Sequence, residues 1–181
     1  MEPPRITYRR LAAADLARIG EIDRTERIET LYVQRGARLE EQAGDFSSPP
    51  WSGEGEGEYS VAHQRAECER HLAADALGLV AFDGERLVGI GLATPHIRPG
   101  IAQLAFLHVS DGYRGRGVGG HLAGQLERFA REQGDHTMVV SATPSANTVH
   151  FYLGRGFEPM AEPLPELYAL EPEDVHMLKL L

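Results

Sequence analysis

The chain is poor in cysteine, in lysine and in long hydrophobic runs, and each scarcity excludes a class of protein. Cys68 stands alone, which excludes an internal disulfide framework. No apolar run approaches the roughly 20 residues that are needed to span a bilayer. The first ten residues, MEPPRITYRR, contain no apolar stretch of the kind that a signal peptide carries. We therefore expect a cytoplasmic protein.

Positive charge is also scarce. The chain has 18 Lys and Arg against 27 Asp and Glu, for a formal net charge of −9. Nucleic acids and anionic membrane surfaces would repel such a chain, so we expect neither as a partner, and cationic small molecules are mildly favoured. A chain of 181 residues buries roughly 70% of the surface that it exposes when unfolded, enough for one core. We expect a single domain over 1–181.

The first third of the chain contains a strand pattern, a helical pattern and a long segment without periodicity. Alternation in RITYRR (5–10) predicts an edge strand, and the spacing of Leu16, Ile19, Ile22 and Ile28 predicts helical structure within 12–33. From about 34 to 60 the periodicity fails, and Pro-Pro and alternating Gly-Glu predict a long loop. Such loops are usually functional or disordered.

The remainder alternates between strand and helix patterns. We expect a helix over 61–76, a hairpin over 77–95, a strand over 101–109, an amphipathic helix over 117–134, a strand over 136–144, a short helix over 145–156 and a last strand over 175–181. This order predicts a mixed α/β sheet and no barrel or bundle.

A glycine-rich loop, YRGRGVGGHL (113–122), lies between the strand over 101–109 and the following helix. Glycines let a main chain approach a ligand closely and leave its N–H groups unobstructed. The helix N-terminus adds about half a positive charge, and Arg114 and Arg116 add full charges. The loop therefore predicts a cradle for phosphate or diphosphate.

Two phosphate-binding motifs fit this loop poorly. A Walker P-loop needs a lysine after its second glycine, but the only lysine of the chain is Lys179. Gly115, Gly117 and Gly120 satisfy the Gly-x-Gly-x-x-Gly dinucleotide fingerprint. The turn before them is not tight, however, and the next strand ends without a ribose-binding acid. A dinucleotide-binding oxidoreductase is a distant alternative.

The same loop resembles the acyl-CoA signature of the GNAT superfamily of N-acetyltransferases, Gln/Arg-x-x-Gly-x-Gly/Ala, with Arg114, Gly117 and Gly119 at the matching positions. A later segment, NTVHFYLGRGF, resembles the Asn-x-x-x-x-Tyr-x-x-x-Gly-Phe segment of that family. There the matching residues are Asn147, Tyr152, Gly156 and Phe157. The two segments span 101–157, whereas the first 75 residues match only in element order.

The resemblance implies a mixed, mostly antiparallel, twisted sheet of about six to seven strands with helices on both faces. It also implies direct transfer of an acetyl group from acetyl-CoA to a primary amine of a small molecule or a peptide N-terminus, without a metal. The chain would be a monomer or a homodimer. A catalytically silent acyl-CoA-binding module is the alternative.

The resemblance further assigns roles to residues. Main-chain amides of the loop would bind the diphosphate, the main chain of the preceding strand would pair with the pantetheine arm, and Asn147 would hold that arm. The Val109 amide would polarise the thioester carbonyl, and Tyr152 would protonate the departing thiolate. The implied cofactor contacts are Leu107, His108, Val109, Arg114, Gly115, Arg116, Gly117, Val118, Gly119, Gly120, Asn147 and Tyr152.

A general base is missing from its usual place. Many relatives carry Glu or His four or six positions before the final Val of the strand, and here those positions hold Ala105 and Gln103. Strict alternation puts both on one face with Leu107 and Val109, and turns His108 toward the core or a helix. A base must come from elsewhere. The candidates are four acids of the first helical region, acting through water, or a histidine at the end of the hairpin: Glu21, Asp23, Glu26, Glu29 and His96. Of these, Glu26 and Glu29 are preferred.

Three other features of the sequence are better explained by structure than by function or leave both explanations open. Cys68 and His71 lie three apart on a predicted helix, but no second ligand pair follows, and no metal site is predicted. The EGEGE segment predicts a solvated loop. Trp51 and Tyr59 either cover the acceptor or anchor this loop to the core, and the sequence leaves both open.

Overall fold

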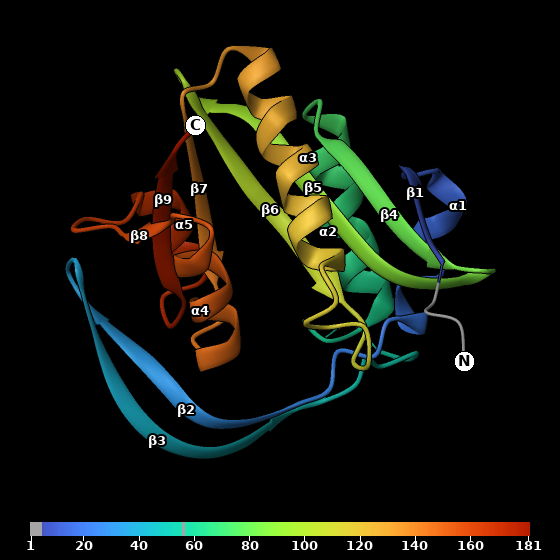
Figure 1. The fold of residues 1–181 in the computed structure, drawn as a ribbon, viewed down its shortest axis with the longest axis horizontal. Helices are drawn as coiled ribbons and strands as arrows, with labels where there is room; N and C mark the ends of the chain where they lie inside the picture. The colour runs from blue at the N-terminus through green and yellow to red at the C-terminus, as the bar shows by residue number, and fades with distance from the viewer. Residues whose placement is uncertain (1–4, 56) are drawn as a thin grey trace.

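The computed structural model describes residues 5–55 and 57–181. In this part of the chain, seven strands form one twisted sheet in the order β1-β4-β5-β6-β7-β9-β8 (Figure 1). All neighbours in it are antiparallel except β6 and β7. The strands are β1 (Ile6–Arg10), β4 (Leu77–Asp83), β5 (Arg86–Arg98), β6 (Ile101–Val109), β7 (Thr137–Ala142), β8 (Glu158–Pro159) and β9 (Val175–Leu180).

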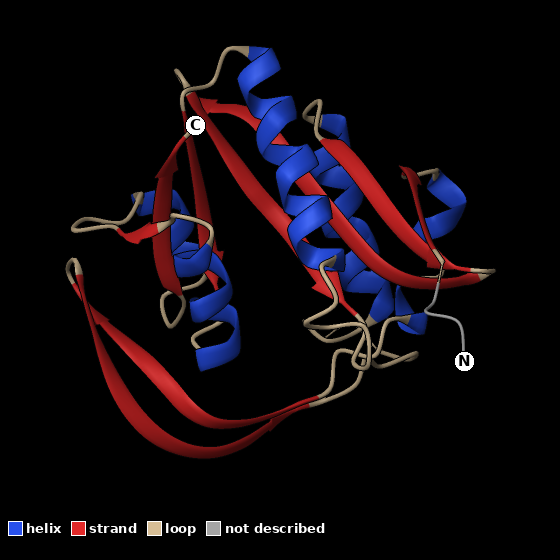
Figure 2. Cartoon of the chain, in the orientation of Figure 1, coloured by secondary structure: helices blue, strands red, loops and turns tan. Residues whose placement is uncertain are grey.

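Helices cover both faces of this sheet (Figure 2). On one face, α1 (Ala13–Leu16), the 3₁₀ turn η1 (Ile19–Glu21) and α2 (Val61–Ala73) bury a cluster that includes Leu16, Ile19 and Cys68. On the other face lie α3 (Val118–Gln133) and α4 (Ala146–Gly154), while α5 (Pro165–Leu170) packs near β7 and β8. The predicted mixed, mostly antiparallel fold with helices on both faces is confirmed.

The position of α3 depends on glycines in the strand beneath it. Val118, Leu122 and Leu126 form a buried stripe at helical spacing, as predicted. A side chain at Gly91 of β5 would come within 2.9 Å of a Leu126 methyl group. Glycine therefore lets the helix lie close to the sheet, which places the N-terminus of α3 next to the end of β6.

The predictions for 12–33 and 34–60 are wrong in part. Helical structure ends at Glu21, and two strands follow, β2 (Glu26–Arg35) and β3 (Arg38–Ser48), which form a separate antiparallel hairpin. Its turn is at Gly36, whose φ of 59° suits glycine. Only Ile28 of β2 is buried, and no residue of β3 is. With so little core contact, the hairpin lacks the hydrophobic pattern from which strands are predicted. Of the expected loop, residues 49–60 remain, and Glu56 of the EGEGE segment lies outside the described residues.

The hairpin is fastened to the C-terminal part of the sheet. The Tyr32 amide donates to the Pro144 carbonyl at 2.8 Å. The Gln34 side chain donates to the carbonyls of Met160 and His176, and it accepts from the His176 amide. Figure 1 shows the hairpin curving below β7, β9 and α4 toward the loop that precedes α2.

The sheet opens between β6 and β7. The two strands pair only at Ile101 to Gln103, although both continue well beyond that point. The register of β6 against β5 shifts by one residue just after this pairing, since Leu92 lies opposite Phe106 but Ala93 lies opposite Leu104. Ala105 is therefore a β-bulge, which bends β6 at the place where it leaves β7. The result is a V-shaped separation between the two strands (Figure 1).

A buried ion pair network links α3, the end of α4 and β9. Glu127 of α3 is 4% exposed and contacts Arg155 at 2.6 Å and Lys179 of β9 at 2.7 Å. Arg155, which follows α4, also donates to the Gly120 carbonyl at 3.2 Å. The network fixes the positions of α3, α4 and β9 relative to one another.

None of the helices found in 5–55 and 57–181 is both long enough and apolar enough to cross a membrane.

Candidate active site

The glycine-rich loop forms an open cradle at the N-terminus of α3. Gly115 and Gly117 have φ values of 70° and 84°, a conformation that favours glycine, and a side chain at either would meet nothing within 4 Å. Among the described residues, no hydrogen bond uses an amide from Arg114 to Gly120 as its donor, and the first helical bond comes from His121. A row of free N–H groups at a helix start is suited to an anion.

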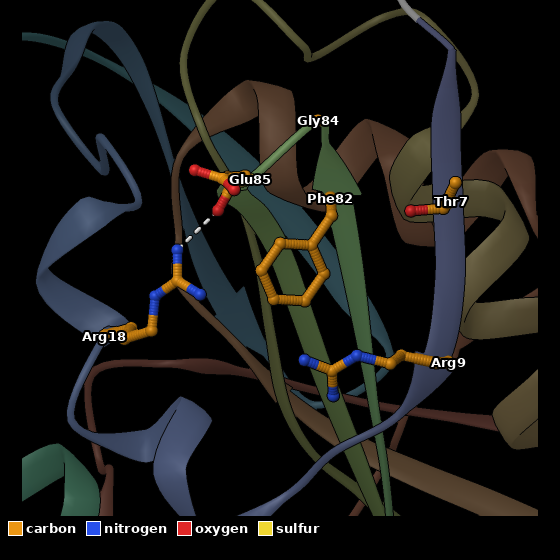
Figure 3. Close-up of a pocket in the computed structure, with 6 residues that line it drawn as sticks. All are labelled: Thr7, Arg9, Arg18, Phe82, Gly84 and Glu85. Atoms are coloured by element: carbon orange, nitrogen blue, oxygen red, sulfur yellow. Dashed lines mark hydrogen bonds between the residues drawn. The ribbon is translucent and has the colours of Figure 1, made fainter.

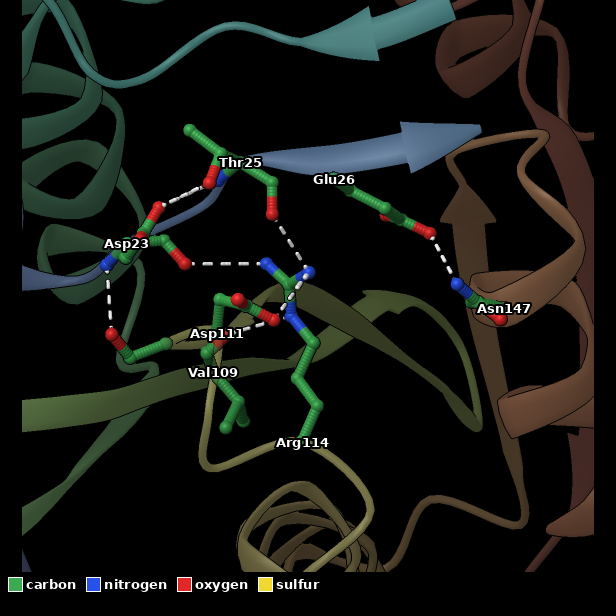
Figure 4. A network of polar contacts seen from close by, with 8 residues as sticks. Asp23, Thr25, Glu26, Val109, Asp111, Arg114 and Asn147 are labelled. Carbon is green, nitrogen blue, oxygen red and sulfur yellow. Dashed lines mark hydrogen bonds and ion pairs between the residues drawn. The ribbon is translucent and has the colours of Figure 1, made fainter. Parts of the chain in front are cut away.

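Arg114 does not point into this cradle, contrary to the expected phosphate contact of its side chain. Its guanidinium donates to three main-chain carbonyls, those of Val109 at 3.0 Å, Thr25 at 3.0 Å and Asp23 at 3.2 Å (Figure 4). The sequence could not reveal this, because the segment over 23–25 is distant along the chain. Arg114 fastens that segment to the end of β6.

Arg116 and Val118 differ in what they can offer a ligand. Arg116 is exposed, and no ion pair involves it in the described part of the chain. Val118, the first residue of α3, is 1% exposed because its side chain packs against the sheet, so only its amide faces the cradle. Tyr113 donates to Asp83 at 2.7 Å and fixes the start of the loop.

The edge of β6 at the opening carries unpaired main-chain groups. The Ser110 amide donates to the Val88 carbonyl, so Ser110 and Val88 form a hydrogen-bonded pair. By antiparallel alternation, Val109 and Leu107 point their N–H and C=O groups away from β5 and toward the opening. Both residues were predicted to pair with a ligand through the main chain, and the geometry makes these groups available, except for the Val109 carbonyl that Arg114 occupies.

The bulge at Ala105 breaks the alternation on which the predicted faces depended. Leu104 packs with the α3 side and Phe106 with the α2 side. Leu107 and Val109 therefore lie on the α3 side with Leu104, and Gln103, opposite Thr94, lies on the α2 side with Phe106. The expectation that Gln103, Ala105, Leu107 and Val109 share one face is wrong.

The His108 side chain lies on the α2 side of β6, away from the cradle. Its ring packs edge-on against Phe106 at 4.6 Å and Trp51 at 5.1 Å, and its main chain belongs to a hydrogen-bonded pair with Ile90. Burial, and then the charges of Arg24 and Arg114, lower the pKa of His108 to about 3. The structure thus contradicts the predicted cofactor contact of His108 and agrees with the expectation that its side chain faces the core.

Tyr152 of α4 is 5% exposed and packs edge-on against Phe151 and Phe157. In the described part of the chain the Tyr152 hydroxyl makes no hydrogen bond, and it is not one of the fully buried polar atoms that lack a partner, so it is open to solvent or a ligand. Burial raises the pKa of Tyr152 above its ordinary value, and the charge of Arg155 offsets part of this rise while the charge of Asp174 adds slightly to it. The phenol is therefore protonated at neutral pH and available as a donor.

Asn147 and Glu26 meet across the opening. The Asn147 amide, in the first turn of α4, donates to Glu26 Oε1 at 2.7 Å, and Glu26 begins β2 (Figure 4). The second predicted base, Glu29, has a side chain that is 75% exposed and lies 3.4 Å from Arg27. Both acids were expected in a helical region, and both lie on β2 instead.

The other three base candidates are each bonded to residues outside the cradle. Glu21 contacts Arg18 at 2.6 Å and accepts from the Leu87 amide. Asp23 accepts from the amide and hydroxyl of Thr25. His96 contacts buried Asp135, which follows the C-terminus of α3, about 24 Å along that helix from the cradle.

Trp51 anchors the loop over 49–60 to the core. It packs on the cluster beneath α2 and against His108. The Arg24 guanidinium lies between the rings of Trp51 and Tyr59, at 4.6 and 4.5 Å. The Arg24 Nε and Trp51 Nε1 atoms are buried without a partner in the described residues.

Cys68 and His71 point to separate surroundings. Cys68 is buried, and burial raises the pKa of its thiol to about 12. His71 Nδ1 lies 2.8 Å from the Thr94 hydroxyl. No group of three His, Cys, Asp or Glu side chains in 5–55 and 57–181 is arranged to hold a metal ion.

Asp174 is the residue that the sequence did not single out. It precedes β9, whose first residue, Val175, lies opposite Ala142 at the end of β7. Its negative charge contributes to the raised pKa values of Tyr152 and Tyr59. In the sequence, Asp174 belongs to the acidic run EPED, which is typical of a solvated turn.

A separate hollow of about 550 Å³ lies at the β1 edge of the sheet (Figure 3). Arg9 and Arg18 line it beside Phe82, but they are already paired with Asp15 and Glu21. Because β6 and β7 lie elsewhere in the strand order, this hollow is not part of the cradle.

Two comparisons of the sequence with known proteins give matches. The model of the acetyltransferase (GNAT) family matches residues 40–157. A rat protein (Rattus norvegicus), N-acetyltransferase 8B, is 36% identical over 93 residues, which are 49% of this chain and 42% of that protein. The chain therefore spans less than half the length of this curated relative.

Solved structures share the fold over nearly the whole chain. The nourseothricin acetyltransferase structure has a TM-score of 0.72 and 21% identity, and the match covers 97% of this chain and 98% of that one. The PaiA N-acetyltransferase of Thermoplasma acidophilum, solved with coenzyme A, has a TM-score of 0.64 and 19% identity, with 98% and 99% covered.

Proposed function

The chain belongs to the acetyltransferase (GNAT) family, and on this premise we propose that it transfers an acetyl group from acetyl-CoA directly to a primary amine of a small molecule. The observation that carries the proposal is the row of free amides at the start of α3, placed at the end of a strand whose edge is also unpaired. The family membership sets aside the dinucleotide interpretation of the same glycines.

The cradle supports binding of the diphosphate. Amides from Gly115 to Gly120 donate to its oxygens, and the dipole of α3 adds partial positive charge. Arg116 adds a full charge from the exposed side of the loop. Arg114 contributes its amide, while its side chain holds the loop in shape.

The edge of β6 supports binding of the pantetheine arm. An extended arm pairs with the main chain of Leu107 and Val109 as an added strand would. The Val109 amide then points toward the thioester carbonyl and donates to the oxyanion that forms when the amine attacks. Asn147, on the opposite side of the opening, holds the arm through its side-chain amide.

Tyr152 acts on the leaving group. Its buried, protonated phenol donates to the departing sulfur and protonates it. A phenol with a raised pKa is a weak acid toward a thiol of pKa about 8.5, so we expect a contribution of about 10²-fold, the lower end of general acid catalysis.

Calorimetry and thiol release test the proposal together. We expect acetyl-CoA to bind and at least one amine among polyamines, amino acids, aminoglycosides and peptide N-termini to raise free thiol above hydrolysis. Absence of acetyl-CoA binding at millimolar concentration overturns the proposal. Binding without turnover by any amine would favour the silent acyl-CoA-binding module instead.

A further inference from the structure

The proposed reaction needs a proton acceptor that the predicted bases do not supply well. An aliphatic amine is an ammonium ion at neutral pH, and it must lose a proton before its lone pair can attack a carbonyl. Glu26 is hydrogen bonded to Asn147, Glu29 is exposed beside Arg27, and His96 lies near the far end of α3.

Asp174 is an acidic residue at the open end of the sheet. It lies at the end of β7 where β6 has already separated from that strand, because Val175 pairs with Ala142. The negative charge of Asp174 makes a small contribution to the raised pKa of Tyr152 on α4 and to that of Tyr59 in the loop over 49–60. The strand register therefore places Asp174 at the end of the sheet where β6 and β7 have separated.

The carboxylate of Asp174 is half-buried and lacks a partner. No hydrogen bond or ion pair to its side chain occurs in the described part of the chain, and only its amide is bonded, to the Glu171 carbonyl at 3.2 Å. The acidic groups around it are Glu171 on its own segment and Glu58 on the loop. An unpaired, desolvated carboxylate is costly for a fold, which is typical of functional positions.

We propose that Asp174 is the base of the acetyl transfer, and that its carboxylate, with Glu58 and Glu171 nearby, selects cationic amine acceptors. The inference rests on the proposed function. The ammonium N–H bond breaks, its proton moves to an Asp174 oxygen, and the freed lone pair forms the bond to the acetyl carbon. When the carbon–sulfur bond breaks, the departing sulfur takes the Tyr152 proton, and the nitrogen gives its second proton to the Tyr152 oxygen. The first proton then leaves Asp174 for solvent.

The electrostatics support this role. Burial, and then the charges of Glu171 and Glu58, raise the pKa of Asp174 to about 7. The other titratable groups whose pKa values depend on its charge, Tyr152 and Tyr59, are phenols with pKa values above their ordinary value of about 10, so they are neutral near pH 7. A base with a pKa near the working pH is the most effective.

The test compares Asp174→Asn with Glu173→Gln, an adjacent exposed acid whose replacement removes the same charge. Acetyl-CoA affinity is measured by calorimetry, and kcat/KM by thiol release between pH 5.5 and 9, with spermidine as the probe. We expect Asp174→Asn to lower kcat/KM by at least about 100-fold, to abolish a rise in kcat/KM near pH 7, and to leave acetyl-CoA affinity within twofold. Glu173→Gln should change none of these.

A second readout does not depend on turnover. A raised carboxyl pKa binds a proton more tightly in the folded state, so stability falls as pH rises from about 4 to about 7. Asp174→Asn removes this loss, and its melting temperature should exceed that of the wild type at pH 8 but not at pH 4.

The outcomes separate the two proposals. If the wild type acetylates spermidine and Asp174→Asn keeps kcat/KM within threefold, or keeps the rise near pH 7, Asp174 is not the base and the proposed function stands. If the wild type binds acetyl-CoA and acetylates no amine, both proposals fail.

Discussion

Two glycines at opposite ends of α3 allow the cradle to be tested against a matched control. Gly117 precedes the helix with a φ of 84°, and Gly134 follows it with a φ of 94°. A methyl group at either meets nothing within 4 Å. Gly117→Ala and Gly134→Ala therefore impose the same backbone strain in equally open surroundings, but only Gly117 belongs to the cradle.

The two changes should cost the same stability and differ in binding. Alanine in the left-handed region costs about 1–2 kcal/mol, and the stiffer unfolded chain offsets about 0.4–1 kcal/mol of that. We expect a net loss of about 1 kcal/mol in each variant, or a melting temperature lower by about 2–4 °C. At Gly117 the methyl group also displaces the diphosphate and tilts the neighbouring amides. Losing one hydrogen bond to a charged group, at about 1.5–3 kcal/mol, weakens binding by about 10- to 100-fold.

Isothermal titration with acetyl-CoA, beside thermal melts, measures both effects. Gly134→Ala should bind as the wild type does. The reasoning is refuted if Gly117→Ala binds acetyl-CoA within twofold of the wild type, or if Gly134→Ala loses as much affinity.

Three further experiments test the proposed acid Tyr152, the ion pair network of Glu127 and the buried thiol of Cys68. Tyr152→Phe should lower kcat by about 10²-fold with unchanged acetyl-CoA affinity and undiminished stability, because the hydroxyl has no partner to lose; an equal loss of kcat and affinity in titration would mean that it only packs. Glu127→Gln should lower the unfolding free energy in urea by about 2–4 kcal/mol, since it leaves two partly buried cations unpaired, whereas Glu132→Gln on the exposed side of the same helix should cost under about 0.5 kcal/mol. Cys68 should react with a thiol reagent only after unfolding, because burial holds its pKa near 12; rapid labelling of the native protein would contradict its buried position.

The central elements of the fold could be predicted from the sequence. The strand over 101–109, the glycine loop and the amphipathic helix are local patterns, and the helix stop at Gly134 lies where it was predicted. Local periodicity and turn chemistry determine such elements, because each depends on residues within a few positions of one another.

Three features escaped prediction for physical reasons. The hairpin of β2 and β3 is mostly exposed, so it leaves no alternation of buried and polar residues to detect. The bulge at Ala105 adds one residue to β6 and reverses the faces beyond it, which no single-strand pattern reveals. The partners of Arg114 and the surroundings of Asp174 come from segments far along the chain, and only the tertiary fold brings them together.

Binding of acetyl-CoA depends most on the free amides between Arg114 and Gly120, and a ¹⁵N-resolved NMR titration observes these amides directly. Acetyl-CoA should shift the amide resonances of Gly115 to Gly120 strongly downfield, whereas S-acetylpantetheine, which lacks the diphosphate, should leave them nearly in place and shift Leu107 and Val109 instead. If acetyl-CoA moves no resonance in the loop, or moves chiefly those around Arg9 and Arg18, the cradle does not bind the diphosphate and the proposed transferase site is wrong.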